Sequence, residues 1–183
     1  DQVIDRRFPH VVGGRPRWFY SRKLVVPGHD GAPRYLLTFN LDVTRQVEAE
    51  QALDRANRFL DTLFDTIPAL LSVREIGSRR YVRVNPTFAR FVGRPVEAIL
   101  SEASAAVVLG DPHEEEATDR LLLAGRPLVQ RTFEADTAYG RRWLAGLDVL
   151  VRDETGTPSH ILTLAEDVTE RVRAERELAE SRT

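Results

Sequence analysis

The sequences LTFNLDVTR at residues 37–45 and LTLAEDVTE at residues 162–170 decide the fold, because they mark two copies of one motif. The copies lie 125 residues apart, and the match extends without a gap over residues 6–55 and 131–180. Of these 50 aligned positions 16 are identical, whereas unrelated sequences of ordinary composition share about three. The only two tryptophans, Trp18 and Trp143, align with each other. The pattern indicates one structural unit that occurs twice.

Each copy contains three predicted strands. In the second copy, alternate residues from Trp143 to Val151 are apolar, which predicts a strand, and the sequence Asp-Glu-Thr-Gly-Thr-Pro at residues 153–158 predicts a turn. We expect strands near residues 3–12, 17–26 and 34–41 in the first copy and near residues 128–137, 140–152 and 159–166 in the second.

After the third strand of each copy the apolar period lengthens to about 3.5 residues, which predicts an amphipathic helix. In the first copy the helix ends at Pro68. The strict spacing favours a parallel dimeric coiled coil, and the alternative is a helix that packs on its own domain. The residues expected to form the dimer contact are Leu53, Leu60, Leu63 and Ile67.

The Asp-Val-Thr junction between strand and helix is the same in both copies. A carboxylate at the end of a strand accepts hydrogen bonds from the first amides of the following helix. A helix cap accounts for this much, and the functional interpretation adds that the cap couples changes in the sheet to the helix. We predict that Asp42, Thr44, Asp167 and Thr169 relay such a change.

The segment between the first helix and the second set of strands, residues 69–127, predicts two strands and three helices. The strands are expected at residues 70–76 and 80–84. Short helices follow Asn85 and Pro95, and a longer helix follows Asp111. From residue 70 onward the predicted order is therefore β-β-α-α-α-β-β-β.

This order, together with several short motifs, resembles the PAS sensor domain of bacterial signalling proteins. The motifs are Thr66-Ile67-Pro68, Val82-Arg83-Val84-Asn85 followed by Phe88 and Gly93, Gly140-Arg141-Arg142-Trp143-Leu144, the turn at residues 153–156, and Asp167-Val168-Thr169-Glu170-Arg171. The resemblance implies an α+β fold. In it, a five-stranded antiparallel sheet carries short helices on one face, encloses a small pocket, and connects to coiled-coil-like helical linkers.

The resemblance also implies where a ligand would bind. Together with the apolar parity of the strands, it gives these candidate pocket residues: Val84, Phe88, Phe91, Phe133, Trp143, Leu147 and Leu164. The alternative is that these side chains only fill the core.

By the same resemblance we expect four regions along the chain. They are the C-terminal part of a first PAS domain (1–42), a helical linker (43–60), a complete second PAS domain (61–168) and the start of an output signalling helix (169–183). The first domain would then begin before residue 1. We expect residues outside the chain, or a neighbouring chain, to cover residues 1–41, because three strands alone would expose an apolar face and an edge.

The composition excludes several kinds of chemistry. The chain has no Cys, which rules out disulfides, cysteine nucleophiles, cysteine-ligated metals and cysteinyl–flavin adducts. His113 begins a sequence that resembles a zinc-protease helix, but Ala117 stands where the second His is required. The formal net charge of −2 lacks the basic excess typical of nucleic-acid-binding domains. We expect no catalytic residue, no metal site, no cofactor and no nucleic-acid partner.

The sequence leaves three functions open. The first is a regulatory sensor and relay module of bacterial cytoplasmic signal transduction. Such a module would form a homodimer, respond to a small molecule or partner, and act on an output domain of the same parent chain, a histidine kinase or a diguanylate cyclase. We expect no direct membrane contact, since the apolar runs are too short to span a bilayer, although the parent protein can be anchored upstream. The alternatives are a redox or gas sensor with noncovalent flavin or haem, and a passive dimerisation spacer.

Overall fold

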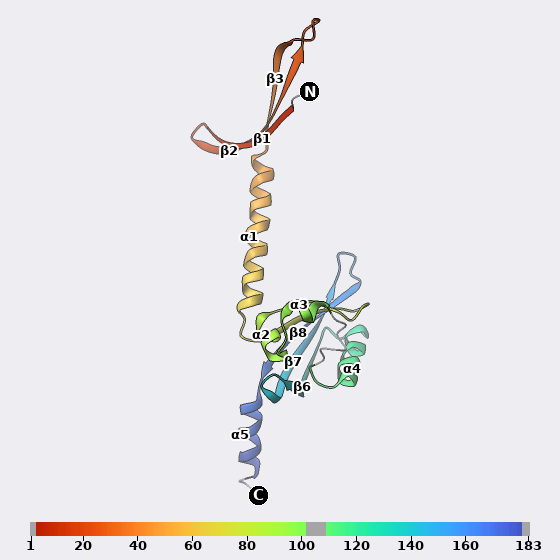
Figure 1. The fold of residues 1–183 in the computed structure, drawn as a ribbon. Helices are drawn as coiled ribbons and strands as arrows, with labels where there is room; N and C mark the ends of the chain where they lie inside the picture. Colours follow the sequence, from red (N-terminus) through yellow and green to blue (C-terminus); the bar gives the residue numbers. More distant parts are fainter. Residues whose placement is uncertain (1–2, 102–108, 181–183) are drawn as a thin grey trace. The chain divides into compact units, whose positions relative to one another are not determined.

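The computed structural model describes residues 3–101 and 109–180, and it divides the chain into two compact units (Figure 1). The first unit comprises residues 1–61 and the second comprises residues 62–183.

The first unit is an antiparallel sheet with strand order β1-β2-β3, followed by a long helix. Its elements are β1 (Val3–Val12), β2 (Arg15–Pro27), β3 (Pro33–Asp42) and α1 (Thr44–Thr66). Gly13 and Gly14 form the two-residue turn between β1 and β2 with positive φ angles of 59° and 76°. A two-residue hairpin turn that matches the twist of its strands requires such angles, and glycine adopts them without strain.

Apolar side chains are exposed on both faces of this sheet. Leu37 and Phe39 are exposed on one face, and Ile4 and Leu36 are exposed on the other. The described residues therefore do not provide the cover that the sequence predicts over residues 1–41. That cover remains a prediction about residues outside the chain or about a second chain.

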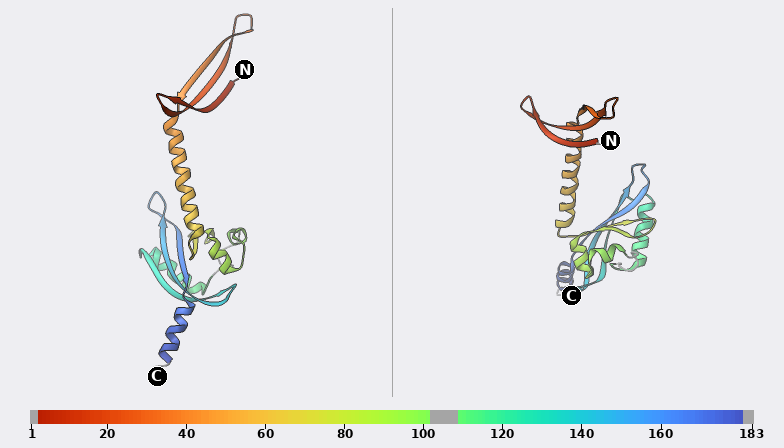
Figure 2. Two further views of the ribbon diagram at one scale, coloured as in Figure 1. Left: turned by 90° about the vertical axis from the view of Figure 1, so that its left-hand side faces the viewer. Right: turned by 45° about the horizontal axis from the view of Figure 1, so that its top comes forward.

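The second unit is a five-stranded antiparallel sheet with strand order β5-β4-β8-β7-β6. Helices α2, α3 and α4 gather on one face of it (Figures 1 and 2). These elements confirm the predicted α+β fold and its element order. Their bounds are β4 (Leu70–Glu75), β5 (Tyr81–Val84), α2 (Pro86–Val92), α3 (Val96–Ser101), α4 (Pro112–Leu123), β6 (Leu128–Thr137), β7 (Gly140–Arg152), β8 (Pro158–Asp167) and α5 (Thr169–Glu180).

Asn85 fixes the point where β5 turns into α2. Its side-chain oxygen accepts hydrogen bonds from the Phe88 amide at 2.9 Å and from the Leu71 amide at 3.1 Å. Its side-chain nitrogen donates to the Ala69 carbonyl oxygen at 2.8 Å. One fully buried amide thus caps the helix and ties it to the neighbouring strand.

The core lies between the sheet and the three helices. Inward-facing side chains come from alternate positions of β6, β7 and β8, and the helices contribute apolar residues above them. Two side chains with no exposed surface, Ile99 and Leu144, lie at its centre. The buried residues of this cluster are Leu70, Tyr81, Val84, Phe88, Ala89, Ile99, Phe133, Ala135, Leu144 and Ala165.

The repeat found in the sequence has a counterpart in the backbone. Strands β6, β7 and β8 begin and end 125 residues after β1, β2 and β3, and α5 begins 125 residues after α1. The pairing registers agree as well: Val3 faces Leu24, and Leu128 faces Val149. Each second hairpin carries an irregularity at the equivalent place, between residues 26 and 27 and between residues 151 and 152.

Candidate functional site

A small cavity lies between the inner face of the five-stranded sheet and helices α2 and α4. Its volume is about 30 Å³, which is roughly the space that one water molecule occupies in the liquid. Five of its lining residues are apolar, and the other six carry polar side chains. The lining residues are Leu70, Phe88, Leu109, Phe133 and Ala165, with Ser72, Arg74, Tyr81, Glu115, Arg131 and Thr163.

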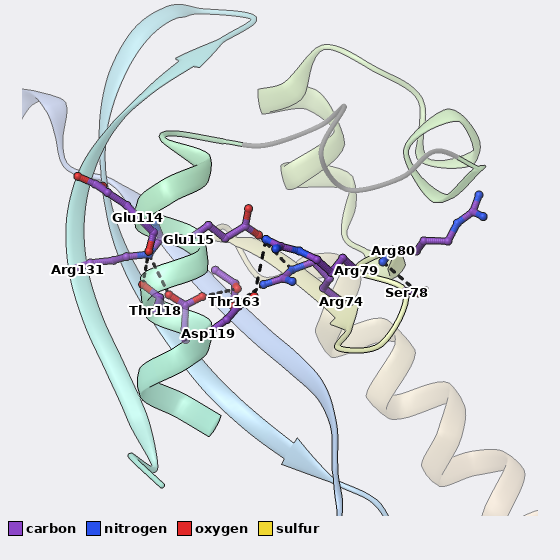
Figure 3. A network of polar contacts seen from close by, with 11 residues as sticks. Arg74, Ser78, Arg79, Arg80, Glu114, Glu115, Thr118, Asp119, Arg131 and Thr163 are labelled. Atoms are coloured by element: carbon purple, nitrogen blue, oxygen red, sulfur yellow. Dashed lines mark hydrogen bonds and ion pairs between the residues drawn. The ribbon is translucent and has the colours of Figure 1, made fainter. Parts of the chain in front are cut away.

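Arg74 connects the sheet to α4 (Figure 3). The alternation of β4 places this side chain on the inner face beside Leu70 and Ser72, where it is 6% exposed. Its Nε lies 3.1 Å from Glu115 Oε1, and its Nη2 donates to Asp119 Oδ1 at 2.7 Å. Burial of a guanidinium group costs stability unless carboxylates lie close to it, and α4 supplies two.

A second buried ion pair lies across strands β6, β7 and β8. Arg131 Nε donates to Asp148 Oδ2 at 3.1 Å, and the hydroxyl of Thr163 donates to Asp148 Oδ1 at 2.5 Å. The Arg131 guanidinium carbon lies 4.2 Å from the centre of the Phe133 ring, within range of a cation–π contact. Both oxygens of Asp148, which is 3% exposed, are thus occupied.

Three buried polar atoms around the cavity have no hydrogen-bond partner among the described residues. They are Arg74 Nη1, Glu115 Oε2 and Arg131 Nη1. A buried polar group without a partner costs about 1–3 kcal/mol, and more for a charged group. Folded proteins therefore satisfy such groups with ordered water or with the polar atoms of a ligand.

Burial controls the ionisation of two lining side chains. It raises the pKa of Glu115, and the nearby Arg74 opposes this shift without cancelling it. Burial also raises the pKa of Tyr81 well above its ordinary range, so the phenol stays protonated at neutral pH. The cavity therefore contains a hydroxyl that can donate and a carboxyl group that gains a proton more readily than an exposed one.

The structure brings together only some of the predicted pocket residues. Phe88 and Phe133 line the cavity, whereas Val84 is buried in the same core and Phe91 packs against that core. The other three candidates, Trp143, Leu147 and Leu164, lie on the opposite face of the sheet and do not line the cavity. In β7 the buried positions are Leu144, Gly146 and Asp148, so the apolar parity that suggested a pocket marks the outer face.

The polar half of the cavity was not predicted from the sequence. The sequence offered one indication: the charged residues Arg74 and Asp148 occupy strand positions of the same parity as the inward-facing residues Ser72 and Gly146. Glu115 lies in the first turn of α4 and faces the core, one turn before Asp119 and two turns before Leu122. Only the three-dimensional pairing of β4 with α4 reveals that these charges are buried together.

The predicted relay residues form one hydrogen-bond arrangement that occurs twice. At the second junction, the Trp143 amide donates to Thr169 Oγ1 at 2.9 Å, and the Thr169 amide donates to Asp167 Oδ1 at 2.9 Å. The Val168 amide donates to the Trp143 carbonyl oxygen at 2.8 Å. These bonds tie the first turn of α5 to β7, the neighbour of the edge strand β6.

At the first junction the same bonds join Trp18, Asp42 and Thr44. The Trp18 amide donates to Thr44 Oγ1 at 2.9 Å, and the Thr44 amide donates to Asp42 Oδ1 at 3.0 Å. Hydrogen bonds from Thr44, together with Arg17 Nη1 at 2.7 Å, lower the pKa of Asp42 from 3.8 to about 2. The carboxylate therefore stays ionised at every physiological pH.

The residues predicted to form a dimer contact lie along α1 and just after it. Leu53, Leu60 and Leu63 are exposed in the single chain, and Ile67 follows the last turn of the helix and is partly buried. Among the described residues of α1 only Val47 is buried. The stripe is therefore accessible to a partner.

A family model described as the PAS fold matches residues 64–173, from the end of α1 to the first turn of α5. The chain belongs to the PAS family. The PAS match contains the cavity, both buried ion pairs and the second junction. A search of curated proteins found no match.

Solved structures with a similar fold include known PAS domains and receptors. An RNA-binding light-oxygen-voltage receptor has a TM-score of 0.56 at 14% identity, with 98% of this chain and 82% of that chain covered. The PAS domain of BvgS from Bordetella pertussis has a TM-score of 0.50 at 23% identity, with 72% and 98% covered. A sensory box histidine kinase/response regulator from Burkholderia thailandensis has a TM-score of 0.51 at 20% identity, with 67% and 94% covered. At these identities the similarity supports the fold alone.

Two further structural features are absent from residues 3–101 and 109–180. No cluster of three or more His, Asp or Glu side chains there is arranged to hold a metal ion. No helix in the same part of the chain combines the length and the apolar character needed to cross a membrane.

Proposed function

We propose that this PAS domain is a sensor and relay module of a bacterial cytoplasmic signalling protein. A change at the cavity would alter the inner face of the sheet and pass through Asp167 and Thr169 into α5. The observation that carries the proposal is the junction itself, because one buried threonine hydroxyl joins β7 to the start of α5. Structural similarity to a sensory box histidine kinase and to the PAS domain of BvgS agrees with a signalling role.

We further propose that residues 1–42 are the C-terminal part of a first PAS domain. Under this proposal residues 43–60 are a helical linker, residues 61–168 are a second PAS domain, and residues 169–183 begin an output helix. The equal strand bounds, pairing registers and junction hydrogen bonds of the two copies support this division. The module itself would catalyse no reaction and would act on a histidine kinase or diguanylate cyclase domain of its parent chain.

Self-association through α1 is the second part of the proposal. Its apolar stripe is exposed, with Leu60 58% exposed, and heptad spacing on a long helix favours a coiled coil with a second copy. A parallel pair of α1 helices would link two PAS domains. A shift of one helix would then shift the helix packed against it.

A cavity of about 30 Å³ favours a small ligand over flavin or haem, because ligand pockets for such molecules usually measure about 300–1,000 Å³. The visible absorption spectrum of the purified chain tests this alternative. A flavin or haem band that persists through purification would replace the small-ligand proposal with a cofactor-bearing sensor.

The relay proposal is tested by filling the cavity and observing α5. Ala165→Val adds two carbons to a residue that lines the cavity. Ala145→Val adds the same two carbons on the neighbouring strand, on the outer face of the sheet, and is the matched control. We expect hydrogen exchange of the α5 amides to change in Ala165→Val and to stay as in the wild type in Ala145→Val. Equal α5 exchange in both variants would contradict the relay.

A further inference from the structure

The charged side chains around the cavity already form ion pairs with one another. Arg74 pairs with Glu115 and Asp119, and Arg131 pairs with Asp148. What remains is a set of three directed hydrogen-bonding positions: the donors Arg74 Nη1 and Arg131 Nη1 and the acceptor Glu115 Oε2. A ligand that fits must satisfy these positions without upsetting the paired charges.

Charged ligands meet a penalty at this site. An anion offers only acceptors, so it leaves Glu115 Oε2 without a donor and brings its negative charge close to that carboxyl group. An ammonium group offers only donors, so it leaves Arg74 Nη1 and Arg131 Nη1 without an acceptor and brings its positive charge close to these guanidinium groups. Either ion also loses its hydration when it enters surroundings of low dielectric constant, which adds a desolvation cost.

An apolar ligand matches only the apolar part of the cavity. It would pack against Phe88 and Phe133, but it would leave all three buried polar atoms without a partner, which destabilises the complex. A neutral molecule that carries both an acceptor and an N–H donor satisfies both kinds of position and adds no charge.

We infer that the cavity takes a small neutral ligand of the amide or lactam class. The carbonyl oxygen of the ligand accepts from Arg74 Nη1 or Arg131 Nη1, its N–H donates to Glu115 Oε2, and its hydrocarbon part lies against Phe88 and Phe133. This inference rests on the proposed function, since it names the ligand of the same cavity. A cavity of about 30 Å³ must enlarge to hold such a ligand, and α4 is the element that moves, because its Glu115 contacts both the ligand and Arg74.

The test uses compounds built on a five-membered ring that differ in hydrogen-bonding groups and charge, and the lactam and the ketone are matched in size. The lactam 2-pyrrolidinone has an acceptor and a donor, cyclopentanone has only the acceptor, and pyrrolidine is a cation at neutral pH. Cyclopentanecarboxylate represents the anions. Each is titrated into the full chain, with binding followed by NMR shifts of residues that line the cavity, such as Phe133 and Ala165. We expect 2-pyrrolidinone to bind about tenfold or more tightly than cyclopentanone, from one additional hydrogen bond to a carboxylate.

Two variants show whether the preference arises at Glu115. Glu115→Gln keeps the size of the side chain and lets it turn an NH₂ group toward the ligand, so the preference for 2-pyrrolidinone over cyclopentanone should disappear. Glu114→Gln alters the exposed neighbour on the same helix and should leave the preference unchanged.

Several results would overturn the inference. These are equal binding of 2-pyrrolidinone and cyclopentanone by the wild type, tighter binding of pyrrolidine or the carboxylate, no binding of any probe, and a preference that survives Glu115→Gln. The proposed relay to α5 can be contradicted independently of the ligand class. If 2-pyrrolidinone binds with the expected preference but α5 exchange does not respond to Ala165→Val, the ligand class is supported and the relay is contradicted.

Discussion

Replacement of Thr169 by valine probes the second junction with little change in side-chain volume. Thr169 is 2% exposed, and its hydroxyl oxygen accepts from the Trp143 amide at 2.9 Å. Valine keeps the shape but leaves this backbone amide without its acceptor, at a cost of about 1–3 kcal/mol when the site is buried. The amide of residue 169 can still donate to Asp167, so the cap keeps its backbone hydrogen bond and loses the one that the Thr169 hydroxyl donates to the same carboxylate.

Thr44→Val is the matched control at the first junction. It removes the equivalent hydrogen bond, also 2.9 Å long, from a threonine that is only partly buried. Water can replace the lost acceptor more easily there, so we expect a cost of about 1 kcal/mol or less. The two variants thus share one chemical change and differ in burial.

Urea denaturation and hydrogen exchange measure these costs. A loss of about 2 kcal/mol with a slope of about 2 kcal/mol per molar urea shifts the midpoint of Thr169→Val by about 1 M. Amides in the first turn of α5 should also exchange faster in this variant, and those of α1 should not. Unchanged stability of Thr169→Val together with unchanged α5 exchange would refute the role given to the threonine hydroxyl.

Three other predictions concern the helix stripe, the cavity and the core. Leu60→Glu combined with Leu63→Glu should weaken self-association in sedimentation velocity experiments, and a dimer that persists at the same concentration would exclude the stripe as the interface. Because burial raises the pKa of Glu115 above 4.5, wild-type stability should fall as the pH rises from 4.5 through that raised pKa. Denaturation midpoints of Glu115→Gln should lack this fall, and identical pH profiles would argue against a buried carboxyl group. Leu144→Ala should cost about 2–5 kcal/mol in chemical denaturation, whereas Leu147→Ala on the outer face should cost less, and equal costs would contradict the assignment of the faces.

The strands and the junctions were predictable because their determinants are local. The alternation in β7, the turn at residues 153–156 and the repeated Asp-Val-Thr motif each lie within a few residues of the structure that they specify. Comparison of the two copies strengthened this prediction, since two sequences that differ at most positions still share one register.

The polar cavity could not be predicted in the same way, because its partners are distant in the sequence. Arg74 and Asp119 are 45 residues apart, and only the packing of α4 over the inner face of the sheet, beside β6 and β7, brings them together. A period-two pattern also does not reveal which face of a strand is covered. Trp143 and Leu147 are as apolar as the core residues beside them, but the helices cover the other face. Charged residues at inward-facing strand positions, such as Asp148, were the local indication of a buried polar site.

The coupling between cavity and helix is tested most directly by combining two substitutions. Hydrogen exchange of the α5 amides is compared for Ala165→Val alone and for Ala165→Val in the Thr169→Val background, each against its own parent. If the hydroxyl of Thr169 carries the change, cavity filling alters α5 exchange in the first comparison and has little effect in the second. An equal effect of cavity filling in both comparisons would show that the change reaches α5 by another route and would contradict the account.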